Sequence, residues 1–317
     1  MMESEFIKVV ITDKRLVGPD HGILELKPVD GSELPTFSAG SHIGVRTPEG
    51  SMRQYSLANS PLERDRYLIA VRADRVGRGA SRSMVEKTQA GDILKILPPE
   101  NNFELVPANE YLFIAGGIGI TPILSMCHKL AADGHQNFRV IYCTQSRENT
   151  VFADELETAD FAANVILHHD GGDPAHLYDL WPHLEQPTAA HVYCCGPKMM
   201  MEDVRDMSGH WPEQQIHFED FKPVEVSQAD DREFTVLLKK SGARITVPKN
   251  QTILETLRER GYDLRSSCES GTCGACKTVL LDGDVEHRDL VLSDKERDRF
   301  IMICVSRAAD EEITIDL

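Results

Sequence analysis

The stretch CESGTCGACK, residues 268–277, places Cys268, Cys273 and Cys276 at C-x4-C-x2-C spacing among small residues. Such a group of cysteines can form disulfides, bind zinc, act as a redox dithiol or hold an iron–sulfur cluster. Cys304 follows after 27 intervening residues and completes the spacing that is typical of plant-type [2Fe–2S] sites. We therefore predict that these four cysteines are metal ligands.

The other kinds of cysteine site fit the pattern less well. A structural zinc site usually pairs its ligands as two C-x2-C units, and the C-x4-C element departs from that form. A thioredoxin-like dithiol needs only C-x-x-C at the start of a helix and would leave two cysteines without a role. Small neighbours let backbone N–H groups approach the negatively charged sulfurs of a cluster. These neighbours are Ser266, Ser267, Ser270, Gly271, Thr272, Gly274 and Ala275. Zinc remains the alternative.

Length and composition predict a cytoplasmic protein of several domains. The 317 residues exceed the usual size of a single core, and 41% hydrophobic with 27% charged residues is typical of soluble globular domains. No apolar run approaches the roughly 18 residues of a membrane-spanning helix. The first residues, MMESEFIKVVITDKR, lack a secretion signal. In a reducing cytoplasm, eight cysteines indicate metal or redox chemistry rather than disulfides.

The negative charge is concentrated in the middle of the chain. Of the net charge of −17, most lies in residues 106–231, where 20 Asp and Glu face six Lys and Arg. An acidic chain without a basic stripe does not suit a phosphate backbone, so we expect no nucleic-acid partner. Solubility alone explains most of these carboxylates.

Changes in sequence pattern predict separate domains. Residues 1–105 contain short apolar runs between Gly and Pro turns, which predict an antiparallel β-barrel. Residues 106–224 alternate nearly continuous apolar runs with helical stretches, which predicts a parallel sheet covered by helices on both sides. The first of these helices is expected to have Thr121 as N-cap and Pro122 at its first helical position, and to stop at Gly134.

The last part of the chain is predicted to be a small β-rich module. The polar residues 225–231 lack periodicity and predict a linker. Residues 232–317 then contain two alternating strands, FTVLLKKSG and ARITVPKN, the helix QTILETLRERG, the cysteine loop and a final strand, EEITIDL. This module would carry the cluster.

Four short motifs occur in order along the chain: RQYSL (53–57), GGIGITP (116–122), YCCGP (193–197) and SCESGTCGACKT (267–278). With these motifs, the chain resembles the phthalate dioxygenase reductase family over essentially its whole length. The resemblance implies an antiparallel FMN-binding β-barrel, a ferredoxin-reductase-like parallel α/β domain for NAD(H), and a C-terminal β-grasp domain of the plant-type ferredoxin kind.

The first motif carries flavin-binding residues in that family. Taken alone, it fits an exposed alternating strand equally well. The resemblance implies that Arg53 meets the flavin phosphate, that Tyr55 packs on the isoalloxazine, and that Ser56 lies near the reactive flavin nitrogen. There the Ser56 hydroxyl would help to receive or stabilise the hydride. We expect Leu57 to belong to the same contact segment.

A second flavin contact is expected where GRGASRS opens a helix. Glycines, hydroxyls and a helix N-terminus can cradle a phosphate, although a solvent-facing N-cap has the same pattern. The resemblance assigns Gly77, Gly79, Ser81 and Arg82 to the flavin phosphate. FMN fits better than FAD, because no segment is evident for a second phosphate and an adenine.

The two middle motifs follow strands, and parallel sheets bind ligands at that edge. GGIGITP departs from the usual dinucleotide fingerprint because Pro122 replaces the third glycine. The resemblance places both motifs beside the nicotinamide and pyrophosphate. The residues concerned are Gly117, Gly119, Thr121, Cys195, Gly196 and Pro197. Cys194 is expected to face the sheet interior, and Cys127 and Cys143 are expected to be structural.

Two further residues bear on the nicotinamide. By resemblance, Phe221 in HFEDF covers the flavin ring until the nicotinamide displaces it. Arg147 in TQSREN is placed to accept the 2′-phosphate of NADPH, but its acidic surroundings offer that phosphate few positive partners. We therefore expect NADH to be the electron donor.

Together these features predict an electron-transfer enzyme. NADH gives two electrons as a hydride and a [2Fe–2S] cluster accepts one, so a flavin is needed between them. The expected acceptor is the Rieske centre of a separate aromatic-ring oxygenase. Two alternatives stay open. One is a reductase for another acceptor, such as a ferredoxin, a cytochrome or an O-demethylase oxygenase. The other is a metal-binding or redox-sensing module without enzymatic activity.

Overall fold

The computed structural model describes residues 6–75, 79–221, 231–264, 266, 271, 274–289 and 291–317. The chain divides into two compact units, Glu3–Asp220 and Phe221–Leu317. The β-barrel and the parallel sheet both lie in the first unit, and the ferredoxin-like sheet forms the second.

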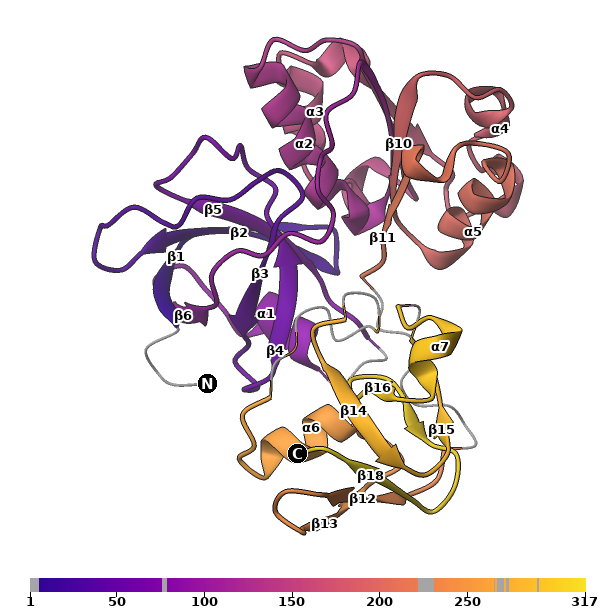
Figure 1. Ribbon diagram of the computed structural model, residues 1–317. Coiled ribbons are helices and arrows are strands. Elements are labelled where there is room, and N and C mark those ends of the chain that lie inside the picture. Colours follow the sequence, from indigo (N-terminus) through magenta and orange to yellow (C-terminus); the bar gives the residue numbers. More distant parts are fainter. Residues whose placement is uncertain are drawn as a thin grey trace. The chain divides into compact units, whose positions relative to one another are not determined.

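The first sheet of the larger unit is antiparallel and closes into a barrel (Figure 1). Its strands are β1 (Ile7–Val17), β2 (His21–Pro28), β3 (His42–Arg46), β4 (Met52–Ser56), β5 (Tyr67–Arg72) and β6 (Ile93–Ile96), in the order β4-β3-β6-β1-β2-β5. A bridge between Leu57 and Ile69 joins the two edge strands. Closure removes the exposed edges that an open antiparallel sheet would present. The predicted barrel is confirmed, with the short helix α1 (Ala80–Glu86) between β5 and β6.

The second sheet of this unit is fully parallel, as predicted. Its strands are β7 (Glu110–Gly116), β8 (Phe138–Thr144), β9 (Val165–His169), β10 (Ala190–Cys195) and β11 (Ile216–Glu219), in the order β11-β10-β7-β8-β9. The chain moves outward from β7 to β9 and then returns to the other side of β7. The strand order therefore reverses between β7 and β10, and ligands of such sheets bind at that switch point.

Helices cover both faces of the parallel sheet. In Figure 1, α2 (Ile120–Ala132) and α3 (Ala153–Thr158) lie on one side, and α4 (Trp181–Leu184) and α5 (Lys198–Met207) lie on the other. Each side has its own core: Phe113 and Leu124 belong to one, and Ile114 and Met201 to the other. Alternate residues of β7 thus face opposite cores, which explains its continuous apolar sequence.

The predicted start of α2 is wrong and its predicted end is confirmed. A 3-10 turn, Gly117–Gly119, runs directly into α2, so Gly119 is the N-cap and Thr121 already lies in the first turn. The Thr121 hydroxyl donates a hydrogen bond to the Ile118 carbonyl at 3.0 Å. At the other end, Gly134 has φ +72° and its N–H bonds the Ala131 carbonyl, as a helix stop requires.

The second unit contains a mixed sheet with its first and last strands paired in parallel at the centre. The sheet order is β13-β12-β18-β14-β16, with β15-β17 as a separate pair. The strands are β12 (Phe234–Leu238), β13 (Arg244–Val247), β14 (Lys277–Asp282), β15 (Val285–Glu286), β16 (Phe300–Met302), β17 (Arg307–Ala308) and β18 (Glu312–Ile315). The helices are α6 (Ile253–Glu259) and α7 (Asp294–Arg297). This is the predicted β-grasp arrangement.

Most of the predicted linker, 225–230, lies outside the described residues. Its last residue, Asp231, is bound within the second unit. The Asp231 carboxylate accepts hydrogen bonds from Arg288 at 2.6 and 3.2 Å, and both side chains are almost fully buried. A buried ion pair of this kind is costly to break, because one partner would be left as an uncompensated charge. In the described part of the chain, no helix has the length and apolar character needed to cross a bilayer.

Candidate functional site

The loops after β7 and β10 meet at the switch point of the parallel sheet. A Cβ atom on Gly119 would lie 2.1 Å from the Cys195 carbonyl oxygen, and one on Gly116 would lie 2.4 Å from Pro197 Cδ. Only glycine allows the two backbones to approach this closely. GGIGITP and YCCGP therefore form one structure. Gly117 has φ +53°, and apart from its immediate chain neighbours no described residue comes within 4 Å of the place where its Cβ would be, so this side is open to a ligand.

The two neighbouring cysteines of β10 point to opposite faces of the sheet. Cys195 belongs to the core under α2, Cys194 belongs to the core under α5, and both are fully buried. Burial raises the pKa of the Cys195 thiol well above its usual value, and it raises that of Cys194 to about 12. Both thiols are therefore neutral at physiological pH. Cys127 and Cys143 are also buried and free.

The first four residues of the RQYSL segment belong to β4 and Leu57 follows it, and the end of the segment is not exposed. Ser56 is 4% exposed and Leu57 is fully buried. The Tyr55 hydroxyl is buried, and the described residues offer it no hydrogen-bond partner. Burial raises the pKa of this phenol, so it stays protonated. A buried hydroxyl without a partner is costly, and a bound cofactor could supply the missing acceptor.

Glu219 is a site residue that the sequence reasoning missed. It ends β11 in register with Cys195, and its carboxyl makes a hydrogen bond with Ser56. Its Oε2 atom is buried and finds no partner among the described residues. Burial raises the pKa of Glu219 to about 8, although the bond with Ser56 acts in the opposite direction. The sequence did contain a signal for Glu219, because HFEDF places a carboxyl at the end of a strand, on the edge of the sheet where ligands bind.

The predicted phosphate loop is described only in part. Gly77 lies outside the described residues. Gly79 is the N-cap of α1 with φ +93°, and Arg82 Nη2 lies 3.7 Å from the place where its Cβ would be. The Ser81 hydroxyl accepts a hydrogen bond from the Asp74 N–H at 3.0 Å and so closes the turn. Their contact with a phosphate stays a prediction, as does that of Arg53, whose Nη1 donates to the Met52 carbonyl.

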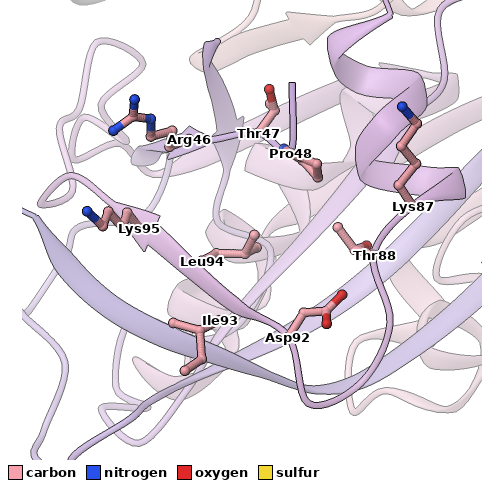
Figure 2. A pocket seen from close by; sticks show the side chains of 9 residues that line it. All are labelled: Arg46, Thr47, Pro48, Lys87, Thr88, Asp92, Ile93, Leu94 and Lys95. Atoms are coloured by element: carbon pink, nitrogen blue, oxygen red, sulfur yellow. The ribbon is translucent and has the colours of Figure 1, made fainter. Parts of the chain in front are cut away.

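An open pocket on the barrel is lined by other residues than these (Figure 2). It is lined by Arg46, Thr47, Pro48, Lys87, Thr88, Asp92, Ile93, Leu94 and Lys95. The Lys87 ammonium in this lining already pairs with Glu49 at 2.5 Å. The pocket contains none of the predicted site residues, so the candidate site rests on the motifs and on their geometry.

Two of the four predicted cluster ligands can be placed. Cys276 and Cys304 are buried in the same core of the second unit, whereas Cys268 and Cys273 lie outside the described residues. Gly271 has φ +76°, and a Cβ there would lie 2.8 Å from the Val305 side chain, next to Cys304. Gly271 therefore lies close to the segment that carries the fourth cysteine. Two buried cysteines in one core suit a cluster, because thiolates are its ligands.

The chain is similar to known proteins both in two of its segments and over nearly its whole length. Residues 236–309 match the family model described as the 2Fe-2S iron-sulfur cluster binding domain, and residues 113–169 match the oxidoreductase NAD-binding domain. The phthalate 4,5-dioxygenase oxygenase reductase subunit of Pseudomonas putida is 50% identical, over 92% of this chain and 91% of that protein. Phthalate dioxygenase reductase of Burkholderia cepacia is 45% identical, over 99% and 98%. The chain belongs to the phthalate dioxygenase reductase family.

A solved structure confirms the architecture of this family member. Its title describes phthalate dioxygenase reductase as a modular structure for electron transfer from pyridine nucleotides to [2Fe-2S]. It matches with a TM-score of 0.87 and 45% identity, and the match covers 99% of each chain. The present protein is thus an NADH-dependent flavin iron–sulfur oxidoreductase whose cofactors are FMN and a [2Fe–2S] cluster.

The described residues fit these cofactors. The unpartnered Tyr55 hydroxyl and the Ser56–Glu219 pair suit a flavin beside β4. Gly117 leaves open space at the switch point for a nicotinamide nucleotide. In the second unit, the buried Cys276 and Cys304 suit the cluster. When bound, the flavin accepts a hydride and passes electrons on one at a time.

Proposed function

We propose that this protein is the reductase component of a Rieske-type aromatic-ring oxygenase system. It would take a hydride from NADH and deliver single electrons, through its cluster, to the Rieske centre of a separate oxygenase. The observation that carries the proposal is the near full-length likeness to a protein named as the reductase subunit of a dioxygenase. The buried Cys127, Cys143, Cys194 and Cys195 form no disulfide, which suits work in the reducing cytoplasm.

We assign the hydride-transfer site to residues from three strand ends and their loops. The loop after β7 contributes Gly117, Gly119 and Thr121. Strand β10 ends with Cys195 and is followed by Gly196 and Pro197, and β4 ends with Ser56. The glycine loop would receive the nucleotide at the switch point, where backbone can approach it closely. The Ser56 hydroxyl would hydrogen-bond the flavin near its reacting nitrogen, and Glu219 would hold a proton next to that hydroxyl.

The electron outlet would be the cysteine loop of the second unit. Cys268, Cys273, Cys276 and Cys304 would be the four ligands, as their plant-type spacing predicts. Cys276 immediately precedes β14, and the first residue of β14, Lys277, pairs with Met302 of the neighbouring strand. This pairing brings residue 276 close to residue 304 in space. The β14–β16 pairing thus fixes the separation of the last two ligands.

Reconstitution tests this function. The holoprotein is mixed with NADH, an aromatic acid and a purified Rieske oxygenase from a phthalate-type system, and product formation is measured against NADH consumption. We expect product only when both proteins are present. Efficient reduction of cytochrome c together with no reduction of any Rieske centre would contradict the proposed partner while leaving the reductase activity intact.

We expect Phe221→Ala to change nicotinamide binding or the rate of hydride transfer. Phe221 is 40% exposed, so a large apolar ring is available for contact without being part of a core. The measurement is anaerobic stopped-flow reduction of the flavin at several NADH concentrations. Leu177→Ala is the control, because Leu177 is another exposed apolar residue, at 58%. Unchanged kinetics in the Phe221 variant would count against a role over the flavin.

A further inference from the structure

The loop after β8 contains Arg147 at the position where nucleotide-binding sheets contact the ribose of the nucleotide. The β7–α2–β8 unit is the first βαβ unit of the sheet, and β8 ends at Thr144. In such units a side chain after the second strand distinguishes the 2′-hydroxyl of NAD from the 2′-phosphate of NADP, and arginine accommodates the phosphate. Arg147 follows Thr144 by three residues. By position alone, it would favour NADPH.

The Arg147 guanidinium is already bound by two carboxylates. Its Nη2 atom donates to Asp154 Oδ1 at 2.7 Å and to Glu157 Oε2 at 2.9 Å. The hydrogen bond with Asp154 is the main cause that raises the pKa of Arg147 above its ordinary value, and the charge of Glu157 adds to it. One positive charge therefore faces two negative ones, and Glu148 adds a third nearby. The net charge at this position is negative.

The loop and the helix that make this contact are held in place. Asp154 and Glu157 lie three residues apart on α3 and so share one face of it. α3 follows Phe152, whose side chain is buried although its φ is +61°. A non-glycine residue in this region is strained and persists only where the surrounding structure enforces it. On the loop side, the Thr150 hydroxyl bonds the Ser146 carbonyl at 2.8 Å.

We propose that Asp154 and Glu157 determine the preference for NADH over NADPH by occupying Arg147. A 2′-phosphate carries a charge of about −1.5 to −2 and would have to displace two carboxylates from the guanidinium. A 2′-hydroxyl carries no charge and can donate a hydrogen bond to a carboxylate. The inference rests on the proposed nucleotide site, and it adds the residues that select the nucleotide.

The test is the double variant Asp154→Asn/Glu157→Gln in the FMN-loaded, cluster-containing protein. Anaerobic stopped-flow reduction of the flavin gives kcat/KM-type efficiencies for NADH and NADPH without any partner protein. We expect the NADPH/NADH efficiency ratio to rise at least about tenfold, because removing charge discrimination changes specificity by that order. The change should appear in the nucleotide concentration for half-saturation and not in the limiting rate, since the 2′ position is remote from the reacting atoms.

Two further variants isolate the mechanism. Asp133→Asn/Glu213→Gln removes two carboxylates from the amino-terminal edge of the same sheet, after α2 and before β11, and should leave the ratio unchanged. Adding Arg147→Gln to the test variant should abolish the gain for NADPH. Inhibition by 2′-AMP relative to 5′-AMP gives a second readout, and we expect the test variant to bind 2′-AMP more tightly.

Three results would overturn the proposal. These are an unchanged ratio in the test variant, an equal gain in the control variant, and a gain that survives the loss of Arg147. The last two would indicate a general effect of negative charge. Failure to reduce a Rieske oxygenase would instead concern the proposed partner, because this assay contains no oxygenase.

Discussion

Cys304→Ser is expected to abolish electron delivery to one-electron protein acceptors and to leave reduction of the flavin by NADH intact. Cys304 is the predicted ligand that lies farthest along the chain from the cysteine loop, and it is 2% exposed in the core that also holds Cys276. A serine oxygen is a much poorer ligand for this cluster than a thiolate. Reduction of cytochrome c or of a Rieske partner should fall at least about a hundredfold, the order of loss seen when a link in a catalytic unit is removed.

The loss should be visible without an activity assay. Iron and sulfide content should drop to near zero, and the visible and electron paramagnetic resonance signals of a [2Fe–2S] centre should vanish. Ferricyanide reduction, which needs only the flavin, should persist. Cys127→Ala is the control, because Cys127 is equally buried but belongs to the core under α2. A Cys304 variant with full iron and sulfide content would show that the ligand set is wrong.

Glu219→Gln is expected to slow flavin reduction by about a hundredfold, the lower end of the usual range for losing a positioned proton donor or acceptor. The carboxyl of Glu219 bonds Ser56, and burial raises its pKa to about 8. It therefore keeps its proton at pH 7. A glutamine has the same shape but cannot exchange a proton in this range. The wild-type rate should change between pH 7 and pH 9, and the variant rate should stay flat.

The free energy of unfolding should also depend on pH through the titration of Glu219. In the unfolded chain Glu219 loses its proton near pH 4.5, whereas the folded protein keeps it until about pH 8. Between these values the folded state binds one more proton, so the free energy of unfolding falls as pH rises and then levels off above pH 8. At about 1.4 kcal/mol per pH unit, the loss could reach about 5 kcal/mol.

The Gln variant should lack this decline. It is therefore expected to match the wild type near pH 5 and to unfold at a higher temperature near pH 9. The measurement is thermal release of the flavin, followed by its fluorescence from pH 5 to pH 9. Glu213→Gln, an exposed change just before β11, is the control and should behave like the wild type. Parallel curves for the Glu219 variant and the wild type would show that this carboxyl titrates normally.

Local features of this protein could be predicted from the sequence alone. Gly134 ends α2 with a positive φ, as predicted, because a helix stop depends on residues within one turn. The strands of the parallel sheet followed from their continuous apolar runs, since each is buried on both faces. Cysteine spacing likewise indicated a [2Fe–2S] cluster, because three of the four cysteines lie close together in the sequence. The predicted start of α2 was wrong, because Thr121 resembles an N-cap residue and the 3-10 turn before the helix has no sequence signal of its own.

The tertiary structure alone decided which side chains face one another across the fold. Ser56 and Glu219 come from different sheets, and the burial that raises the pKa of Glu219 exists only after both sheets have packed. The acidic sequence around Arg147 already predicted NADH, but only the folded structure shows that Asp154 and Glu157 are the carboxylates that bind it. Motifs with local geometry thus identified the cofactors from the sequence. The protonation state of Glu219 and the partners of Arg147 depend on desolvation and on charges brought together by folding, and these are properties of the packed structure.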